Sequence, residues 1–587
     1  MPPTHSDPRD EVPAAGSQTR PEARPEASPE ATLNARLDAA IAAHEQGRIA
    51  EARPVYEEAL RRDPGNAVAL HMLGLAQLQS GQEAAGLQLL RASLQLQPRN
   101  AAFHLNLGKA LQAAGQRAPA LAAFEAALAL RPELAAARSG RAALLQELGR
   151  TDESVAALRA ALEQQPEDPE LHCRLGIALG QQQASEPALA HLERAVALAP
   201  GYGEAWFCRG IALQRLDRPA AAEQSYARAL ALNPRHAKAW SNRGTALQVL
   251  GRTDEALACF EQAVACDPTL ADAHWNYAVS LLLNGRLEEG FARYEWRWKA
   301  AASGMKARPF AQPLWLGGEP LAGRTILLHA EQGMGDTLQF CRYAPLVAAQ
   351  AARVVLVVPT ALRAIMGTLE GVREGRIEVL AFGDALPATD FHCPLLSLPL
   401  ALGTRLDTIP APVPYLRTDG EQVQAWAARL GPRRRPRVGL AWSGSNAYGN
   451  DAERSIPLAQ LLPWLPPGLD YISLQREVRA EDLPALELRP DIRQYGLDLG
   501  DFAHTGALME LLDLVVSVDT SMGHLAGALG RPFRTLLSVN PNWRWMLGRD
   551  DSPWYPSARL YRAHAHGDWS GALEPLHAEL RALAGGG

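Results

Sequence analysis

The 587-residue sequence lacks the usual marks of a disulfide-bonded, zinc-binding or membrane-spanning protein. None of its six cysteines stands in a CxxC pair, so we expect buried thiols in a reducing compartment. No run reaches the roughly 18 uninterrupted apolar residues that a membrane-spanning helix needs. The first residues, MPPTHSDPRDEVP, do not follow the basic-then-apolar order of a signal peptide. These absences predict a cytoplasmic protein without a membrane span.

Net positive charge is also missing. The formal net charge is −6 at pH 7, which argues against nucleic acid or an anionic membrane as a partner. One short basic run, residues 433–437, is interpreted as a solvated linker. Hydrophobic residues make up 47% of the chain, which is enough to bury cores, and a chain of this length requires more than one core.

What the sequence does contain is a strict repeat. Residues 1–30, rich in Pro, Ala, Glu, Ser and Arg, are predicted to form a disordered tail. Beyond them, prolines recur every 34 residues, and glycines recur at the same step or its multiples. The prolines are Pro64, Pro98, Pro132, Pro166, Pro200, Pro234 and Pro268, and the glycines are Gly47, Gly81, Gly115, Gly149, Gly251 and Gly285. Glycine permits a positive φ in a turn, and proline ends a helix because it lacks the N–H donor.

This spacing is typical of one helix–turn–helix unit per repeat. A period of about 34 residues is that of the tetratricopeptide repeat, and residues 31–300 resemble that family. Stacked units of this kind form a superhelix with a concave surface that can hold a protein or an extended peptide. The aromatic stretch at residues 294–298 is expected to cap the repeats or to attach them to the next domain.

The concave face of the repeats is expected to include Asn106, Asn242 and Asn276, which lie at multiples of the repeat step. An asparagine side chain can bond both the C=O and the N–H of an extended peptide. Such a ladder resembles that of O-GlcNAc transferase solenoids, which makes these residues candidates for acceptor binding. The alternative is that they are ordinary consensus residues, because the intervening positions carry other residue types.

Beyond residue 320 the pattern changes to short β-branched runs that alternate with helical stretches. After a linker over 301–322, we expect an α/β domain of two Rossmann-like halves, 323–415 and 433–580, separated by the Pro- and Arg-rich passage 409–437. Strands are predicted at 325–330, 354–358, 377–381, 438–442, 471–474, 514–518 and 535–537. Parallel sheets bind ligands beyond the carboxyl ends of their strands, so a ligand cleft is expected where the halves face each other.

Polar residues stand at the ends of two of these strands. Asp336 follows a Gly-Met-Gly turn and is expected at the N-terminus of a helix, where the helix dipole favours its ionised form. Ser443 and Ser445 follow the first strand of the second half, and Arg454 comes shortly after them. Taken alone, a Gly-Asp turn of this kind is weak, because helix-capping aspartates are common.

A third group ends the strand at 514–518. Asp519, Thr520, Ser521 and His524 open a helix there, in the way that aims backbone N–H groups at a phosphate. The structural alternatives are that Asp519 and Thr520 only cap the helix and that His524 is a half-buried ring. The joint occurrence of three such groups at strand ends favours the functional interpretation.

Together these motifs resemble those of the heptosyltransferase-like (family 9) glycosyltransferases of the GT-B fold, over about residues 322–570. The resemblance rests on Gly335-Asp336, on the Asp519–His524 turn and on Arg454. It implies that Asp336 is the general base. The sequence has no DxD motif with suitable flanks and no His/Cys cluster, so neither a metal nor another cofactor is expected. The residues that the resemblance assigns to the phosphates of the nucleotide-sugar donor are Arg454 and, in the turn that Asp519 opens, Thr520, Ser521 and His524. Ser443 and Gln475, at neighbouring strand ends, are further candidates for the nucleotide. Ser521 departs from the glycine usual there, and the Trp-rich segment 542–556 is not typical of the family.

The whole chain resembles bacterial proteins that fuse tetratricopeptide repeats to such a domain, some of which look like flagellin glycosyltransferases. The resemblance implies a protein O-glycosyltransferase that moves a sugar from a nucleotide-sugar to Ser or Thr of a protein held by the repeats, with flagellin a candidate acceptor. One alternative is a non-catalytic scaffold or chaperone with a degenerate transferase domain. Another is a heptosyltransferase-like enzyme acting on lipopolysaccharide, although a glycolipid acceptor does not require a long peptide groove.

Overall fold

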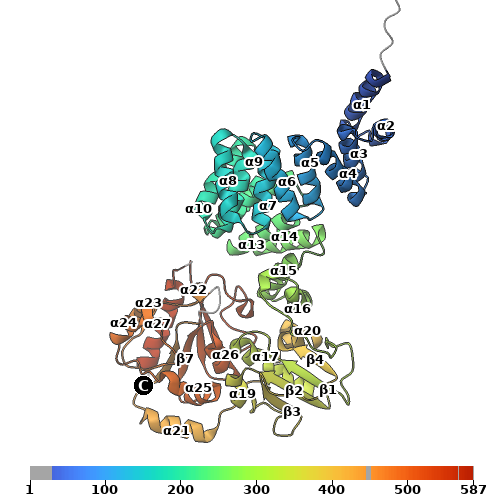
Figure 1. The fold of residues 1–587 in the computed structure, drawn as a ribbon. Coiled ribbons are helices and arrows are strands. Elements are labelled where there is room, and N and C mark those ends of the chain that lie inside the picture. Colours follow the sequence, from blue (N-terminus) through green and yellow to red (C-terminus); the bar gives the residue numbers. More distant parts are fainter. Residues whose placement is uncertain (1–28, 411, 445–450, 566, 586–587) are drawn as a thin grey trace, which may run out of the picture. The chain divides into compact units, whose positions relative to one another are not determined.

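The structure, a computed structural model, describes residues 29–410, 412–444, 451–565 and 567–585 (Figure 1). The chain forms two compact units, Met1–Ala212 and Leu213–Gly587. Residues 1–28 of the predicted tail lie outside the described part. The last two residues of that predicted tail are helical instead, since α1 begins at Pro29. Proline suits the first position of a helix because the N–H that it lacks would have no helical partner there.

The first unit consists of antiparallel helix pairs, and the second unit begins with more of them. The helices of the first unit are α1 (Pro29–Glu45), α2 (Ile49–Arg62), α3 (Ala67–Gln79), α4 (Glu83–Leu96), α5 (Ala101–Ala113), α6 (Arg117–Leu130), α7 (Ala135–Glu147), α8 (Thr151–Gln164), α9 (Pro169–Gln181), α10 (Ser185–Leu198) and most of α11 (Gly203–Arg215). Those of the second unit are α12 (Pro219–Leu232), α13 (Ala237–Val249), α14 (Thr253–Cys266), α15 (Ala271–Leu283) and α16 (Leu287–Tyr294). The predicted all-α repeat region is confirmed.

Small residues let the two helices of a pair approach closely. A Cβ atom added to Gly108 would lie 2.8 Å from the ring of Phe124, and one added to Gly244 would lie 2.8 Å from the ring of Phe260. Both rings are buried, so they have no room to move aside. In these repeats, glycine in the first helix of a pair leaves room for an aromatic or leucine side chain of the second helix.

The turns inside the helix pairs use a left-handed residue. The glycines of the repeat pattern have positive φ values, for example 81° at Gly47 and 73° at Gly149. Gln183 and Asp217 stand at the corresponding positions of two other repeats and also adopt positive φ, 62° and 53°. The helix stack thus imposes the left-handed conformation even where the residue has a side chain that disfavours it.

A second periodic feature was not recognised in the sequence. In six successive repeats, a side chain near the start of a helix donates a hydrogen bond to the carbonyl oxygen of the proline six residues earlier, at 2.6–3.0 Å. The donors are His104, Arg138, His172, Trp206, Trp240 and His274. Carbonyl groups after a helix end lack helical partners, and these side chains supply one. We call this set the proline-carbonyl donors.

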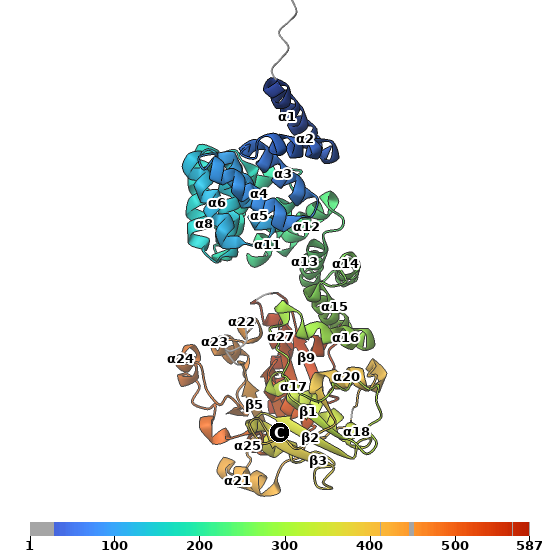
Figure 2. The ribbon, with the colours of Figure 1, turned by 45° about the vertical axis from the view of Figure 1, so that its right-hand side comes forward.

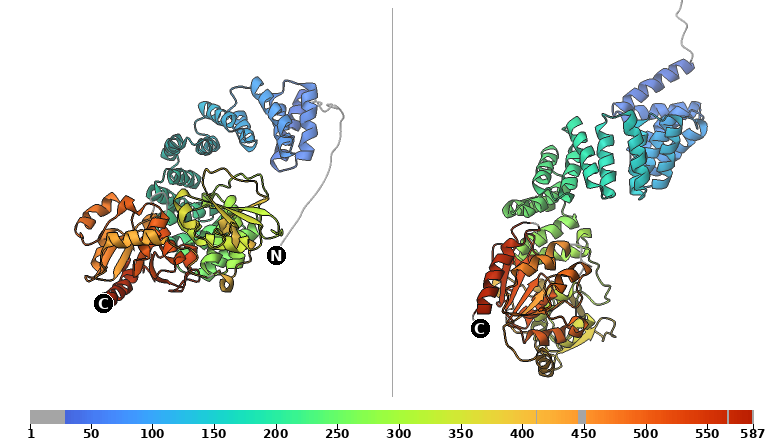
Figure 3. Two further views of the ribbon diagram at one scale, coloured as in Figure 1. Left: turned by 90° about the horizontal axis from the view of Figure 1, so that it is seen from below. Right: turned by 90° about the vertical axis from the view of Figure 1, so that its left-hand side faces the viewer.

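The rest of the second unit holds two parallel sheets (Figure 3). The first has four strands in the order β3-β2-β1-β4, all parallel. Its elements are β1 (Thr325–His329), α17 (Met334–Phe340), α18 (Ala344–Ala348), β2 (Arg353–Val358), α19 (Thr360–Met366), β3 (Ile377–Ala381), β4 (Phe391–Pro394) and α20 (Leu398–Ala401). One face of this sheet packs on the helices α17, α18 and α19, whereas the residues Leu327, Val355 and Val357 of the other face pack on Phe310.

The second sheet has five parallel strands in the order β6-β5-β7-β8-β9. Its elements are α21 (Gly420–Leu430), β5 (Arg437–Ala441), α22 (Asp451–Arg454), α23 (Leu458–Leu461), β6 (Asp470–Ser473), α24 (Leu483–Glu487), α25 (Phe502–Met509), β7 (Leu514–Val518), α26 (Ser521–Ala528), β8 (Phe533–Leu537), β9 (Ala558–Arg562) and α27 (Ser570–Gly585). Figure 2 shows α27 beside β9, with which it packs.

Three of these elements correct the sequence interpretation. The passage 409–437, predicted only as a separator, contains α21, which buries Trp426 and Leu430. β4 and β9 were not predicted. β4 is short and ends in a proline, and two of the five residues of β9 are arginines, so neither strand has the apolar run that marked the other strands.

The last repeat packs on the α/β region within the second unit. Phe291 of α16 meets Trp543 edge to face, with ring centroids 5.6 Å apart. The backbone N–H of Leu547 donates to the carbonyl of Leu283 at 3.0 Å. Arg297 follows α16, is fully buried, and donates to Ser397 Oγ at 2.6 Å. The aromatic stretch 294–298 therefore joins the repeats to the α/β region.

Candidate functional site

The candidate site lies at the carboxyl ends of β1, β5 and β7. In the first sheet β1 lies between β2 and β4, and in the second β5 lies between β6 and β7. These are the points where the strand order reverses, and open parallel sheets bind ligands at such points. Asp336 follows β1, Ser443 follows β5 and Asp519 follows β7. Ser445 lies outside the described residues.

Asp336 occupies the first turn of α17, which begins at Met334, two residues before the predicted start. Its Oδ2 accepts a hydrogen bond from the backbone N–H of Gly333 at 2.9 Å. Its Oδ1 forms an ion pair with Arg544. Both carboxylate oxygens therefore have a partner, while 19% of the side chain stays exposed. A substrate hydroxyl would have to use a remaining lone pair or displace Arg544.

Arg544 is a site residue that the sequence reasoning missed. It lies in the 3-10 helix η9 (Trp543–Trp545), and its guanidinium sits 4.4 Å from the Trp543 ring centroid. Its Nη1 donates to Asn542 Oδ1 at 2.7 Å, and its side chain is 5% exposed. The available signal was the Trp-rich segment itself, which departs from the family resemblance. It predicted no position for the arginine because the segment has no helical or strand period.

The two sheets meet through α17 and α26, which pack against each other. A Cβ atom on Gly335 would lie 2.6 Å from His524 Cδ2, so this glycine allows the close approach. His524 is 4% exposed, and its Nδ1 lies 2.9 Å from Tyr555 Oη. Burial lowers its pKa well below the usual value, and the positive charges of Arg544 and Arg342 act in the same direction. The ring is therefore neutral and is used in packing.

The N-terminus of α26 holds the predicted Asp519, Thr520 and Ser521. Thr520 caps the helix, since its Oγ1 accepts from Met522 N at 3.3 Å and lies 3.0 Å from Ser517 Oγ. Burial raises the pKa of the Asp519 carboxyl, while the neighbouring Trp545 and Arg544 oppose this shift. Ser521 is partly exposed at the first helical position. The capping alternative thus describes Thr520, and it leaves the backbone N–H groups of the first turn directed outward.

Arg454 lies beside this turn. Its Nη1 donates to the carbonyl of Asp519 at 3.3 Å, and its Nε lies 3.3 Å from Asp451 Oδ1. Arg479, which the sequence interpretation did not single out, pairs with the same Asp451 and donates to Gly444 O at 3.0 Å. Asp451 therefore holds two arginines at the carboxyl end of β5, and their summed charge suits an anion.

Ser443 and Gln475 bind each other rather than Asp336. Gln475 Nε2 donates to Ser443 Oγ at 2.6 Å, and Ser443 is 6% exposed. The structure therefore brings Asp336, Arg544, Asp519 and Arg454 into one neighbourhood and places this pair at its edge, by β5 and β6.

The space at the site is small. A pocket of about 10 Å³ is lined by Arg454, Asp519 and Asn542, among others, which is room for about one water molecule. α17, α26 and the Trp-rich segment contribute side chains to one hydrophobic core where the two halves meet. A nucleotide does not fit this pocket unless Arg454 or the segment around Asn542 moves. The ligand cleft between the halves stays a prediction.

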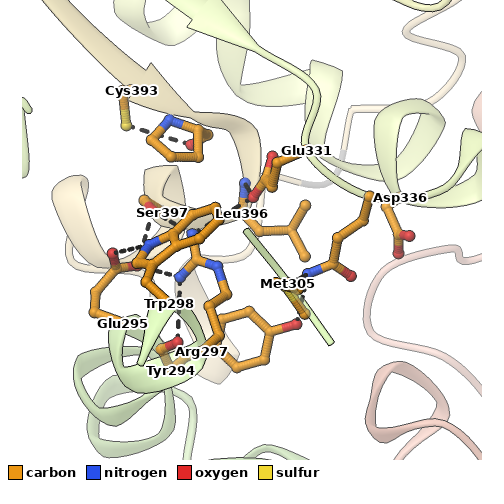
Figure 4. A network of polar contacts seen from close by, with 12 residues as sticks. Tyr294, Glu295, Arg297, Trp298, Met305, Glu331, Asp336, Cys393, Leu396 and Ser397 are labelled. Atoms are coloured by element: carbon orange, nitrogen blue, oxygen red, sulfur yellow. Dashed lines mark hydrogen bonds and ion pairs between the residues drawn. The ribbon is translucent and has the colours of Figure 1, made fainter. Parts of the chain in front are cut away.

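A buried polar network connects the Asp336 loop to the end of the repeats (Figure 4). Arg297 Nη2 lies 3.5 Å from Glu331 Oε1, which also accepts from Leu396 N at 3.1 Å. Gln332 Nε2 donates to Tyr294 Oη at 3.0 Å. Burial raises the pKa of Glu331 to about 7, opposed by the charge of Arg297. The loop that carries Asp336 is thus held by Tyr294, the last residue of α16, and by Arg297 just after it.

The predicted asparagine ladder is partly engaged within the repeats. Asn106 Nδ2 donates to His71 Nε2 at 2.9 Å, and Asn276 Nδ2 donates to Ser241 Oγ at 3.2 Å. Each partner lies in the preceding repeat. Burial lowers the pKa of His71 to about 4, so the ring is neutral and can accept. Asn242 is partly exposed. A contact with an acceptor peptide by these three residues stays a prediction.

Five of the six cysteines are buried and Cys266 is partly exposed, all of them as free thiols. Within the described ranges, no three side chains of His, Cys, Asp or Glu converge in the way a metal site requires. None of the helices in the part of the chain that the structure covers is both long and apolar enough to cross a membrane.

Comparisons with solved structures give only distant likenesses. A tetratricopeptide repeat protein from Parabacteroides merdae is 15% identical with a TM-score of 0.36, covering 43% of this chain and 99% of that one. A thermophilic TPR protein from Thermus thermophilus is 28% identical with a TM-score of 0.28, covering 31% of this chain and 100% of that one. The Cut9–Hcn1 complex gives 17% identity and a TM-score of 0.37, over 41% of this chain and 48% of that one.

Sequence comparisons match one bacterial protein and two repeat-family profiles. Protein FlbA of Caulobacter vibrioides is 27% identical over 325 residues, which is 50% of this chain and 52% of that protein, so the match spans about half of each. A family profile described as Tetratricopeptide repeat matches residues 37–101, 208–271 and 242–304, and one described as TPR repeat matches 145–183. The N-terminal region of this chain is therefore built of tetratricopeptide repeats, followed by a region of two parallel α/β sheets.

Proposed function

We propose that the protein is an O-glycosyltransferase that transfers a sugar from a nucleotide-sugar to a Ser or Thr hydroxyl of a protein recruited by the repeats. The observation that carries the proposal is the meeting of two loops from different parallel sheets. The Gly335-Asp336 turn after β1 packs directly on the turn after β7, with Gly335 against His524. A carboxylate and a helix terminus that suits an anion thus lie close together, which supports transfer from a nucleotide-sugar donor.

The proposed binding of the nucleotide-sugar donor depends on electrostatic attraction to its phosphate groups. The departing nucleoside phosphate would bind the backbone N–H groups at the start of α26, helped by Arg454 and Arg544. Asp519, Thr520 and Ser521 shape this turn, and Ser443 with Gln475 would contact the nucleotide. His524 packs on Gly335, and its Nδ1 lies 2.9 Å from Tyr555 Oη, so it positions the turn; its contact with the phosphate stays a prediction. The proposal needs no metal and no other cofactor.

In the proposed reaction, Asp336 accepts the proton of the acceptor hydroxyl. The hydroxyl oxygen then forms the bond to the anomeric carbon of the sugar. The bond from that carbon to the phosphate oxygen breaks, and its electron pair leaves with the nucleoside phosphate. Direct displacement of this kind inverts the anomeric configuration. Arg544 has to release Asp336 before the hydroxyl can approach, and a phosphate group is a suitable alternative partner for it.

The proposed binding of the acceptor protein rests on the contacts between the end of the repeats and the loop that carries Asp336. The side chains of Tyr294, at the end of α16, and Arg297, just after it, hold Gln332 and Glu331 of the loop that carries Asp336. A polypeptide held by the repeats of the second unit, α13 to α16, would therefore be delivered next to the catalytic loop. Asn106, Asn242 and Asn276 are the proposed acceptor contacts. Flagellin is the first acceptor to test, because the sequence resembles flagellin glycosyltransferases.

The test uses the full-length protein, a panel of nucleotide-sugars and purified flagellin. Intact mass should show addition of one or more sugar masses, and Asp336→Asn should abolish the addition while flagellin still binds. Asp390→Asn is the matched control, because Asp390 pairs with Arg324 at the opposite end of β1 and should leave transfer unchanged. Equal transfer by Asp336→Asn would exclude Asp336 as the base.

A second function, a non-catalytic scaffold or chaperone, is favoured by one observation. Both oxygens of Asp336 are engaged and the adjacent pocket has room for about one water molecule. This alternative predicts that no nucleotide-sugar raises the melting temperature of the protein, although an acceptor still binds. Transfer to a lipid-linked saccharide, and not to protein, would instead support the heptosyltransferase-like alternative.

A further inference from the structure

A cavity of about 440 Å³ lies on the face of the first sheet opposite to α17, α18 and α19. Its floor is formed by Leu327 and His329 of β1 and Val357 of β2. Parallel sheets are normally covered on both faces. Here the second face is covered mainly by the segment around Phe310, and the cavity opens beside that segment.

The walls of this cavity are largely apolar. Phe310 packs on His329 with ring centroids 4.6 Å apart, and Phe382 and Leu386 form the outer wall. Phe382 is 38% exposed and Leu386 is 48% exposed, and both lie in the lining of one cavity. An apolar ligand body of moderate size would bury both. Cavities of about 300–1,000 Å³ are typical of small-molecule sites.

The polar groups of the lining define the charge that a ligand should carry. The Arg308 guanidinium lies 4.2 Å from the Phe382 ring centroid, and no hydrogen bond or ion pair engages it among the described residues. The acidic residue of the lining, Asp384, is already paired with Arg363 at 3.4 Å and accepts from Ala381 N at 2.9 Å. Arg308 therefore offers a positive charge at the mouth of an apolar cavity.

His329 does not add charge. Burial lowers its pKa to about 3, and the neighbouring His392 acts in the same direction, so the ring is neutral. Its Nε2 lies 3.3 Å from His392 Nδ1, and its own Nδ1 is buried without a hydrogen bond partner. A buried ring nitrogen without a partner is costly unless a ligand or water supplies one. A small shift of the ring would present it to a ligand in the cavity.

We propose that this cavity binds a small molecule with an apolar body and a single carboxylate, which pairs with Arg308. A guanidinium binds a carboxylate with two parallel hydrogen bonds and stacks on an aromatic ring at the same time. One positive charge balances one negative charge, whereas Asp384 in the wall would oppose a doubly charged phosphate. The cavity shares no lining residue with the Asp336 loop, so this inference does not depend on the transferase proposal.

Titration calorimetry of the full-length protein tests the inference with three probes: 4-phenylbutyrate, its neutral amide and phenyl phosphate. We expect the carboxylate to bind at one site, about tenfold or more tighter than the amide and the phosphate. Arg308→Gln and Leu386→Glu, both at exposed positions, should each weaken carboxylate binding by about tenfold or more.

Arg353→Gln is the matched control, because Arg353 is an exposed arginine at the opposite end of the same sheet, paired with Glu378. It should leave binding unchanged. Three results would each overturn the proposal: no binding of the carboxylate, equal binding of the amide, or equal binding by Arg308→Gln.

Discussion

At the scale of single residues, the repeats show one role filled by different side chains. The proline-carbonyl donors include His, Arg and Trp, and all six bond the carbonyl oxygen of the proline six residues earlier. Their chemistry differs, but each places an N–H at the same point. A pattern defined by residue identity does not detect them. Their shared function is visible only once the helix and the preceding loop are in place.

This role predicts a rescue by a residue from another repeat. Trp240→Phe keeps the ring over Arg243 but removes the N–H that donates to Pro234, so we expect a loss of about 0.5–1.5 kcal/mol in the free energy of unfolding. Trp240→His should recover part of this loss, because histidine fills the same role at His274. Urea denaturation of the three proteins measures the difference. Equal stability of Trp240→Phe and wild type would contradict the role.

The left-handed turns give a second prediction at this scale. Gln183 adopts φ 62°, which costs about 1 kcal/mol or more for a residue with a Cβ, so Gln183→Gly should raise the free energy of unfolding by up to about 1 kcal/mol. The reciprocal change, Gly149→Gln at φ 73°, should lower it by a similar amount. Thermal melts of both variants check the pair. A gain from both substitutions, or a loss from both, would refute the explanation.

At the scale of elements, the close contact between α17 and α26 depends on Gly335, which has no Cβ. Gly335→Ala places a methyl group 2.6 Å from the His524 ring, which is itself held by Tyr555 and stacked on Trp545. We expect a loss of about 1–3 kcal/mol in the free energy of unfolding. Gly318→Ala is the control, since a Cβ there meets no atom within 4 Å and the variant should match wild type. Chemical denaturation gives both values.

Strands and repeats could be predicted well from the sequence, and parts of the site could not. The repeat period and the runs that became β1, β2, β3, β5, β6, β7 and β8 carry strong local signals. β4 and β9 depend on neighbouring strands for their stability and lack such signals. Arg544 pairs with Asp336 across more than 200 residues of sequence, a contact that only the packing of η9 creates. The packing of the Trp-rich segment beside α17 and α26 likewise has no local signal in the sequence.

At the scale of the whole molecule, the second unit joins repeats and sheets through buried polar groups as well as apolar contacts. Arg297 is fully buried between Glu295, Glu331 and Ser397, at 3.5 Å from Glu331 and 2.6 Å from Ser397. Arg342 similarly crosses between the two sheets, donating to Trp554 O at 2.6 Å and to Tyr415 Oη at 2.9 Å. Groups of this kind make the repeat end, the Asp336 loop and the second sheet depend on one another.

The Glu331 carboxyl makes this junction sensitive to pH. Burial raises its pKa to about 7 in the folded protein, whereas an unfolded glutamate titrates near about 4.3. Between these values the folded state binds the proton and the unfolded state does not, so this group's contribution to stability falls as pH rises from about 4.3 to 7. Below that window both states are protonated, and above it both are ionised, so the contribution is constant there.

Glu331→Gln removes this titration while keeping an oxygen that can accept from Leu396 N. The variant should therefore gain stability relative to wild type as pH rises from 5 to 8, by as much as about 3 kcal/mol. Urea unfolding followed by tryptophan fluorescence measures the difference, since Trp298 and Trp543 lie close to this junction. Glu378→Gln, which removes an exposed carboxylate on β3, is the control: its free energy of unfolding should change with pH in the same way as that of wild type. If the free energy of unfolding of Glu331→Gln also changed with pH as that of wild type does, Arg297 would be keeping Glu331 ionised. The junction would then be a permanent ion pair instead of a pH-dependent one.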